Sequence, residues 1–193
     1  LVTGSNLGSL SDKSLLNTST SALLSGTFAG TVDSTAEVSQ THSFDPTKQF
    51  FKTSVTITNV TSSALSDVLF MRSFDPDNTV YKSGSYSTTN KIEKTFAAGD
   101  GAAMVSATSG NDAYSDANGS PSTVFFFSSD SRARVYTGGF SNNNPYDYRS
   151  GHDKNYTKTA DEAIGIVFDI GGLGAGESKT FDYFTSLTTI DES

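Results

Sequence analysis

The amino-acid sequence predicts an all-β protein, a β-sandwich of the immunoglobulin-like, Greek-key type with long calcium-binding loops. Ser and Thr make up 56 of the 193 residues, and the chain also holds 17 Gly, 14 Phe and 8 Tyr. Hydroxyl, glycine and aromatic residues suit pleated strands joined by tight turns and are poor material for long helices. The segment Phe50–Val60 alternates with period two, which is typical of a half-buried strand. One face of that strand carries Phe51, Thr53, Val55, Ile57 and Asn59.

The length fits one domain covering residues 1–193. Residues 1–25 are rich in Ser, Thr and Leu and form an entry segment. This segment holds either a short helix around Lys13–Leu24 or an irregular strand. The ends of the chain, at Leu1 and at Asp191–Ser193, resemble the borders of a monomeric module within a longer protein.

Further strands are expected wherever apolar or β-branched residues alternate between turn signals. A strand ending at Asp75-Pro76 is expected because Pro cannot continue a sheet ladder. The other polar stretches, Ser109–Ser122 and Thr137–Asp161, are long enough to be binding loops. The expected strands are Thr27–Val32, Asp67–Phe74, Lys91–Phe96, Ala102–Ala107, Val124–Ser128, Arg132–Tyr136, Ala163–Asp169 and Lys179–Leu187.

Charge and composition exclude several classes of function. The net charge of −8 argues against nucleic acid, which needs a basic face. The sequence holds no Cys, which rules out a thiol nucleophile and a Cys-ligated zinc site, and no apolar run is long enough to cross a membrane. The only two histidines, His42 and His152, are not accompanied by a nucleophile motif. We therefore expect no catalytic residues and a protein that is not an enzyme.

Oxygen-bearing side chains in the expected loops point to calcium. The segment Asp75-Pro76-Asp77-Asn78 places three of them within four residues at a strand end, and Pro76 stiffens the loop. Calcium takes six to eight oxygen ligands, chiefly from carboxylates, amides and carbonyls. The alternatives are that these residues serve as turn formers and that the acidity serves solubility. The predicted metal ligands are Asp75, Asp77, Asn78, Asp153 and Asp161.

A second group of residues is expected to contact a ligand. Arg72 lies within an apolar strand, where it either pairs with a carboxylate or faces solvent. Gly138 and Gly139 would permit close approach of a ligand backbone. Tyr146 and Tyr148 either flank the ligand as amphipathic contacts or cover an end of the sandwich.

Three segments resemble the peptide-binding domains of large calcium-dependent RTX (repeats-in-toxin) adhesins of bacteria. They are FKTSVTITNVTSSALSDVLFMRSFDPD at Phe51–Asp77, DSRARV at Asp130–Val135 and ADEAIGIVFDIGGLGAGESKTFDYF at Ala160–Phe184. The resemblance covers about residues 28–187. It implies a secreted, cell-surface sandwich that binds the free C-terminus of a peptide or protein ligand on another cell through bound calcium. Such a module serves cell adhesion and biofilm formation.

Two other functions fit the same residues. A calcium ion can bridge vicinal sugar hydroxyls, and loop tyrosines can stack on a pyranose ring, so a carbohydrate-binding lectin module is the first alternative. A structural spacer stiffened by calcium is the second, although a spacer has no use for a loop as long as Thr137–Asp161.

Overall fold

The computed structural model describes residues 10–77, 80, 84–109 and 122–187, which form two antiparallel β-sheets. The all-β sandwich predicted from the sequence is therefore confirmed. Within the described residues, no helix has the length and apolar character needed to cross a membrane. The strands are β1 (Leu10–Asn17), β2 (Leu24–Val32), β3 (Ala36–Phe44), β4 (Phe50–Asn59), β5 (Leu65–Phe74), β6 (Thr88–Lys94), β7 (Ala103–Ser109), β8 (Thr123–Ser128), β9 (Ala133–Gly138), β10 (Thr157–Ala160), β11 (Ala163–Leu173) and β12 (Ser178–Ser186), with short 3₁₀ helices η1 (Phe96–Ala98) and η3 (Pro145–Tyr148).

The larger sheet has nine strands in the order β1-β2-β3-β4-β12-β8-β7-β6-β10, and the smaller has three in the order β5-β11-β9. The chain leaves the large sheet three times, for β5 after β4, for β9 after β8 and for β11 after β10, and returns to the large sheet after each of these strands. These crossings insert β12 between β4 and β8, a non-sequential order of the kind that Greek-key sandwiches share.

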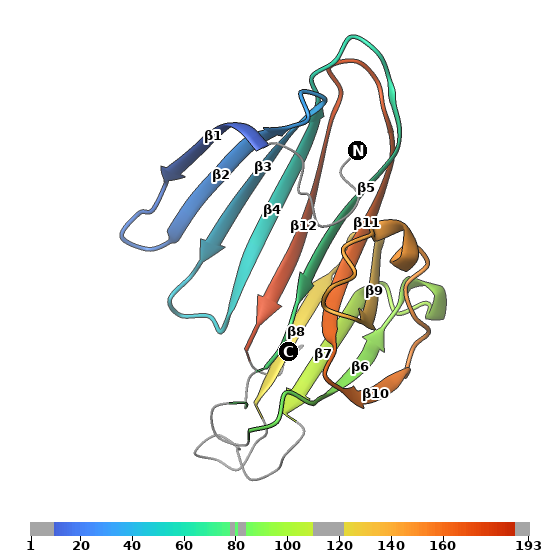
Figure 1. Cartoon of the computed structure of the whole chain (residues 1–193). Coiled ribbons are helices and arrows are strands. Elements are labelled where there is room, and N and C mark those ends of the chain that lie inside the picture. Colours follow the sequence, from blue (N-terminus) through green and yellow to red (C-terminus); the bar gives the residue numbers. More distant parts are fainter. Residues whose placement is uncertain (1–9, 78–79, 81–83, 110–121, 188–193) are drawn as a thin grey trace.

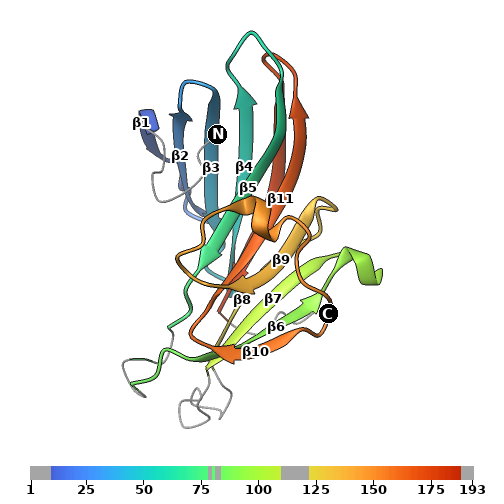
Figure 2. The same ribbon diagram turned by 45° about the vertical axis from the view of Figure 1, so that its right-hand side comes forward.

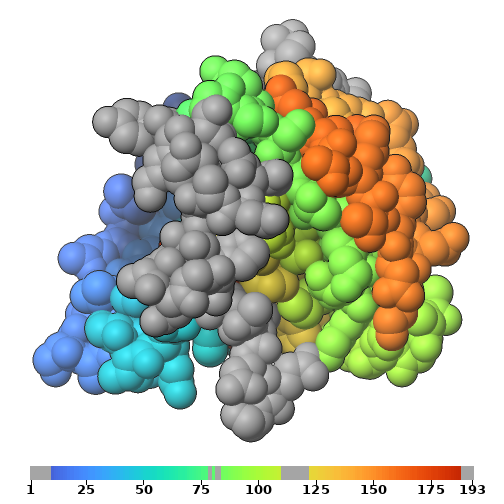
Figure 3. Space-filling view, turned by 90° about the horizontal axis from the view of Figure 1, so that it is seen from below, coloured from blue at the N-terminus to red at the C-terminus, as the bar shows by residue number. Residues whose placement is uncertain are grey.

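The small sheet covers only part of the large one. Figures 1 and 2 show β5, β11 and β9 lying over the region from β4 to β6, while β1, β2 and β3 extend past β5. Seen from below, blue and cyan residues of β1–β4 occupy one side of the molecule, and green and orange residues of β6, β7 and β10 occupy the other (Figure 3).

The core lies between the sheets and is built from the alternating positions that the sequence indicates. Val55 and Ile57 on β4 face the core, with Thr53 and Asn59 buried on the same face as predicted. Phe168 on β11 stacks on Phe181 on β12, with ring centroids 4.3 Å apart. Aromatic contacts of this kind tie the two layers together.

The structure corrects the sequence prediction at the entry segment and adds two strands. The alternative of a helix around Lys13–Leu24 is wrong, because Leu10–Asn17 pairs with β2 as an edge strand. Strands β3 and β10 were not expected, since both are polar or only partly buried and lack strong alternation. Their pairing with β4 and β6, rather than their own hydrophobicity, makes them strands.

Gly165 on β11 leaves room for a buried ring. A Cβ at this position would overlap the ring of Tyr136, which is 1% exposed and sits in the paired position on β9. We expect Gly165→Ala to cost about 1–3 kcal/mol, because overpacking forces side chains off their rotamers. In thermal unfolding, each kcal/mol should lower the melting temperature by about 2–4 °C for a domain of this size.

The matched control is Gly139→Ala, because no atom lies within 4 Å of a Cβ built there. This variant should unfold within about 0.5 kcal/mol of the parent chain. Equal stability of the two alanine variants would contradict the steric role assigned to Gly165.

Candidate metal centre

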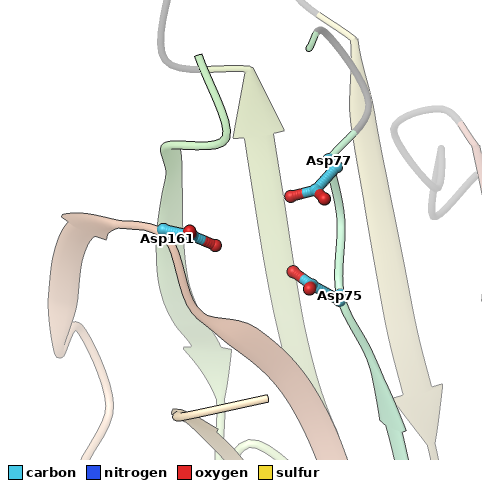
Figure 4. A group of neighbouring side chains, drawn as sticks. All are labelled: Asp75, Asp77 and Asp161. Atoms are coloured by element: carbon cyan, nitrogen blue, oxygen red, sulfur yellow. The ribbon is translucent and has the colours of Figure 1, made fainter.

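Three of the five predicted metal ligands come together at one end of the sandwich. Asp75 and Asp77 follow the last residue of β5 on either side of the buried Pro76, and Asp161 lies in the short connection from β10 to β11. One carboxylate oxygen from each residue lies within 4.8 Å of the other two. Figure 4 shows the side chains of Asp75 and Asp77 directed toward Asp161.

The spacing of these oxygens suits a hard cation. Calcium binds oxygen at about 2.3–2.6 Å, so two ligands on opposite sides of one ion are at most about 5 Å apart. The Oδ1 atom of Asp77 is buried and has no hydrogen-bond partner. A buried carboxylate oxygen without a partner is costly, and a bound cation removes that cost. The three carboxylates could therefore hold a metal ion.

The electrostatics of Asp75 point in the same direction. Burial raises the pKa of the Asp75 carboxyl, and the negative charges of Asp77 and Asp161 and a hydrogen bond with Asp77 raise this pKa further. All four causes disfavour the charged form, as expected where carboxylates lie close together.

Strand register places two buried hydroxyl residues near Asp161 that the sequence did not single out. Thr88 on β6 pairs with Ser109 on β7 and with Ala160 on β10, the residue before Asp161. The hydroxyl of Thr88 donates to Oδ1 of Asn90, and the buried Oγ of Ser109 has no hydrogen-bond partner. No signal in the sequence distinguishes these two residues from the many other Ser and Thr residues.

The other two predicted metal ligands stand apart from this group. Asn78 lies outside the described residues. Asp153 lines a small cavity of about 40 Å³ together with Arg134 and His152, beside the 3₁₀ helix η1. The group formed by Asp75, Asp77 and Asp161, called the acidic triad below, does not include it.

Arg72 faces the large sheet from β5. Phe70, two residues earlier on the same face, packs against Phe168 and Phe181 in the core. The charge of Arg72, after burial itself, lowers the pKa of His42 on β3. The side chain is exposed, and among the described residues it has neither an ion pair nor a hydrogen bond. Of the two sequence alternatives, the structure therefore favours the exposed one.

The four remaining residues that the sequence predicted to contact a ligand lie at the small sheet, toward its outer face. They are Gly138, Gly139, Tyr146 and Tyr148. The ring of Tyr148 stacks on Tyr136 with centroids 3.7 Å apart, and the hydroxyl of Tyr146 donates to the backbone oxygen of Asp67 at 2.8 Å. A Cβ at Gly138 would overlap the Tyr148 side chain, whereas Gly139 faces open space. These contacts give Tyr146, Tyr148 and Gly138 packing roles, with the tyrosines lying against Leu69 and Met71.

Comparison with known proteins leaves the chain without a family. No protein-family model matches it, and no curated protein matches it. A TPR-domain-containing protein from Parabacteroides distasonis superposes with a TM-score of 0.49 at 11% identity, covering 93% of this chain and 35% of that one. Heparinase III superposes with a TM-score of 0.44 at 12% identity, covering 94% of this chain and 22% of that one. The chain thus spans about a third and about a fifth of these two proteins, and neither likeness assigns it a function.

Proposed function

We propose that the chain is a calcium-dependent ligand-binding module of a large bacterial surface adhesin, secreted and serving cell adhesion and biofilm formation. The observation that carries the proposal is the acidic triad, with the buried and unpartnered oxygen of Asp77. The resemblance of Phe51–Asp77 and Ala160–Phe184 to RTX adhesins agrees with it, because these two segments contain all three triad residues.

The proposed ligand is the free C-terminus of a peptide or protein on another cell. Three monodentate carboxylates leave several of the six to eight positions of a calcium shell open. A carboxylate is the favoured ligand atom for a hard cation, and a peptide C-terminus offers one in a sterically thin form. The net charge of −8 supports a bridging cation, since this acidic surface would otherwise repel a carboxylate.

The histidines support a binding role rather than a catalytic one. Nδ1 of His42 lies 2.9 Å from the hydroxyl of Thr53, and the ring of His152 packs against Tyr156 with centroids 4.6 Å apart. Burial is the main cause that lowers the pKa of both rings. In neither ring do these contacts include a catalytic partner, and we propose that the module is not an enzyme.

Titration calorimetry with a matched pair of peptides tests the proposed ligand. In saturating calcium we expect a short peptide with a free C-terminus to bind, and its amidated form to bind about tenfold to a hundredfold more weakly. The reason is that losing a charge-assisted contact costs on the order of 1.5–3 kcal/mol. Chelation with EGTA should abolish binding of the free acid.

Free monosaccharides serve as the competing ligands in the same experiment. Binding of a monosaccharide together with equal binding of the acid and the amide would replace the peptide proposal with the lectin alternative. No binding of either class, with calcium still bound, would leave the structural spacer.

A further inference from the structure

The part of the large sheet that extends past β5 presents an apolar face toward the side on which the small sheet lies. Residues that pair directly across neighbouring strands point to the same face of a sheet. Gln40 on β3 pairs with the core residue Val55, and Phe28 on β2 pairs with Gln40, so both lie on the face that the core occupies. Leu15 on β1 pairs in turn with Phe28. The face of β1–β3 built from such positions, with Phe51 on β4, is called the shelf below.

Large apolar side chains on the shelf are exposed. Leu15 is 82% exposed, Leu24 is 52% exposed and Phe51 is 36% exposed. A hollow of about 460 Å³ is lined by Leu24, His42, Phe44 and Phe51, and a second of about 150 Å³ reaches from the shelf under β5. The strands β1 and β2 make their main contacts within their own sheet. Clusters of exposed apolar side chains are typical of interaction surfaces.

Strand β5 borders the shelf with an edge that is open from Val68 to Phe74, whereas the backbone oxygen of Asp67 accepts a hydrogen bond from Tyr146. Among the described residues, the ten-residue strand pairs only with β11. Its stretch Val68–Phe74 holds one charged residue and no Pro. Natural sheets usually blunt an exposed edge with charges, Pro, bulges or a covering loop, since its free backbone groups pair with other strands.

The other three sheet edges show such protection. In β9, the backbone oxygen of Val135 accepts a hydrogen bond from the backbone of His152. Strand β10 has only four residues, and β1 is interrupted by an irregularity between Ser11 and Ser14. The part of the β5 edge from Val68 to Phe74 is therefore the one that remains open to a further strand within the described part of the chain.

Arg72 supplies a charge at this edge. Arg72 projects toward the shelf from the stretch Val68–Phe74 of β5. Its charge lowers the pKa of His42 on β3 and acts to lower the pKa of Tyr183 on β12. In a chain with a net charge of −8, an exposed guanidinium without a described carboxylate partner is suited to a partner's carboxylate.

We propose that an extended segment of a partner protein adds to the β5 edge above the shelf, with apolar side chains on the shelf and an Asp or Glu opposite Arg72. Stacked sheets lie about 10 Å apart, so a strand paired with β5 would continue the layer of the small sheet over the shelf. Backbone pairing would provide affinity, and the shelf and Arg72 would provide specificity, as in other β-strand additions. This site is separate from the acidic triad, and binding to it is expected without calcium.

The test uses a short fluorescein-labelled peptide, amidated at its C-terminus, in which Val alternates with Thr and the central Val is replaced by Glu, so that the Glu side chain lies on the same face as the other Val residues and as Arg72. A matched peptide carries Lys at that position, and all measurements are made in EGTA. We expect the full chain to bind the Glu peptide at least about tenfold more tightly than the Lys peptide. Arg72→Glu should reverse this preference, Arg72→Gln should remove it, and Lys13→Glu on the far edge strand should leave it unchanged.

Hydrogen exchange locates the bound peptide. The backbone amides of Phe70–Phe74 that are not bonded to β11, which alternate along the strand, should exchange rapidly in the free chain and be protected by the Glu peptide. Equal binding of both peptides by all variants would overturn the proposal, as would binding that requires calcium. Protection of these amides in the free chain would mean that the chain itself covers the β5 edge. A dimer that dissociates in Arg72→Glu would mean that a second copy of the chain covers the edge. Either result would overturn the proposal. If the peptide with a free C-terminus does not bind in calorimetry with calcium, the result at the β5 edge still stands. The reason is that the triad is tested in saturating calcium and the β5 edge in EGTA.

Discussion

Replacing the buried Asn59 by Asp should destabilise the protein by about 3–5 kcal/mol at neutral pH. The side chain is fully buried at the end of β4. Its Nδ2 donates to the backbone oxygens of Ser63, Leu173 and Gly174 at 2.7, 3.1 and 2.9 Å. In Asn59→Asp a carboxylate would face these three acceptors, and an uncompensated buried charge typically costs this much. Chemical denaturation followed by Tyr fluorescence or circular dichroism measures the loss.

The matched control is Asn17→Asp on β1. There the side-chain oxygen accepts from the backbone N–H of Ser19 at 2.9 Å, and a carboxylate can accept the same bond. This exposed variant should unfold within about 0.5 kcal/mol of the parent. The introduced carboxyl in Asn59→Asp should have a raised pKa, so its penalty should shrink as the pH falls toward about 4, where the unfolded chain also becomes protonated. A loss below about 1 kcal/mol at neutral pH would contradict the role assigned to Asn59.

Calcium should raise the melting temperature, and neutralising the triad should abolish that effect. An ion bound only by the folded chain stabilises it by about 2.7 kcal/mol when its free concentration is a hundred times the dissociation constant. For a chain of this length, that corresponds to a rise of about 5–10 °C. Relief of the repulsion among Asp75, Asp77 and Asp161 acts in the same direction, because their mutual charge disfavours ionisation of Asp75.

Asp77→Asn tests this prediction, since its buried Oδ1 is the triad oxygen without a partner. We expect the melting temperature of this variant to be the same in calcium and in EGTA. The matched control is Asp153→Asn, a carboxylate outside the triad, which should keep the full calcium response. A response lost in Asp153→Asn but retained in Asp77→Asn would place the ion elsewhere, and an unchanged melting curve of the parent chain on chelation would refute calcium binding.

Strands with strong alternation were predictable from the sequence, and those without it were not. Phe50–Asn59 alternates Thr, Val, Ile and Asn toward the core, so both its existence and its buried face could be read directly. Ala36–Phe44 and Thr157–Ala160 carry mostly polar or exposed residues, and they become strands because β4 and β6 offer them backbone partners. Such pairing is a property of the assembled sheet.

The candidate metal site was predictable from the sequence only where its residues are close together in the chain. Asp75 and Asp77 are close in the sequence and follow a strand end, so their proximity is a local property that Pro76 reinforces. The sequence also pointed to Asp161, but only the tertiary structure showed that Asp161 rather than Asp153 approaches them. The connection from β10 to β11 reaches this corner because β11 pairs antiparallel with β5, which places the start of one strand beside the end of the other.

The sequence by itself determined the class of the fold, the face of each strongly alternating strand and the oxygen-rich character of the loops. These properties follow from side-chain chemistry and a repeat of two residues, which act locally. The tertiary structure alone decided which carboxylates meet, that Tyr146 and Tyr148 pack on the outer face of the small sheet, and that the β5 edge stays open above an apolar shelf. Those outcomes depend on strand order and on how far one sheet covers the other, and contacts between residues distant in the chain set both.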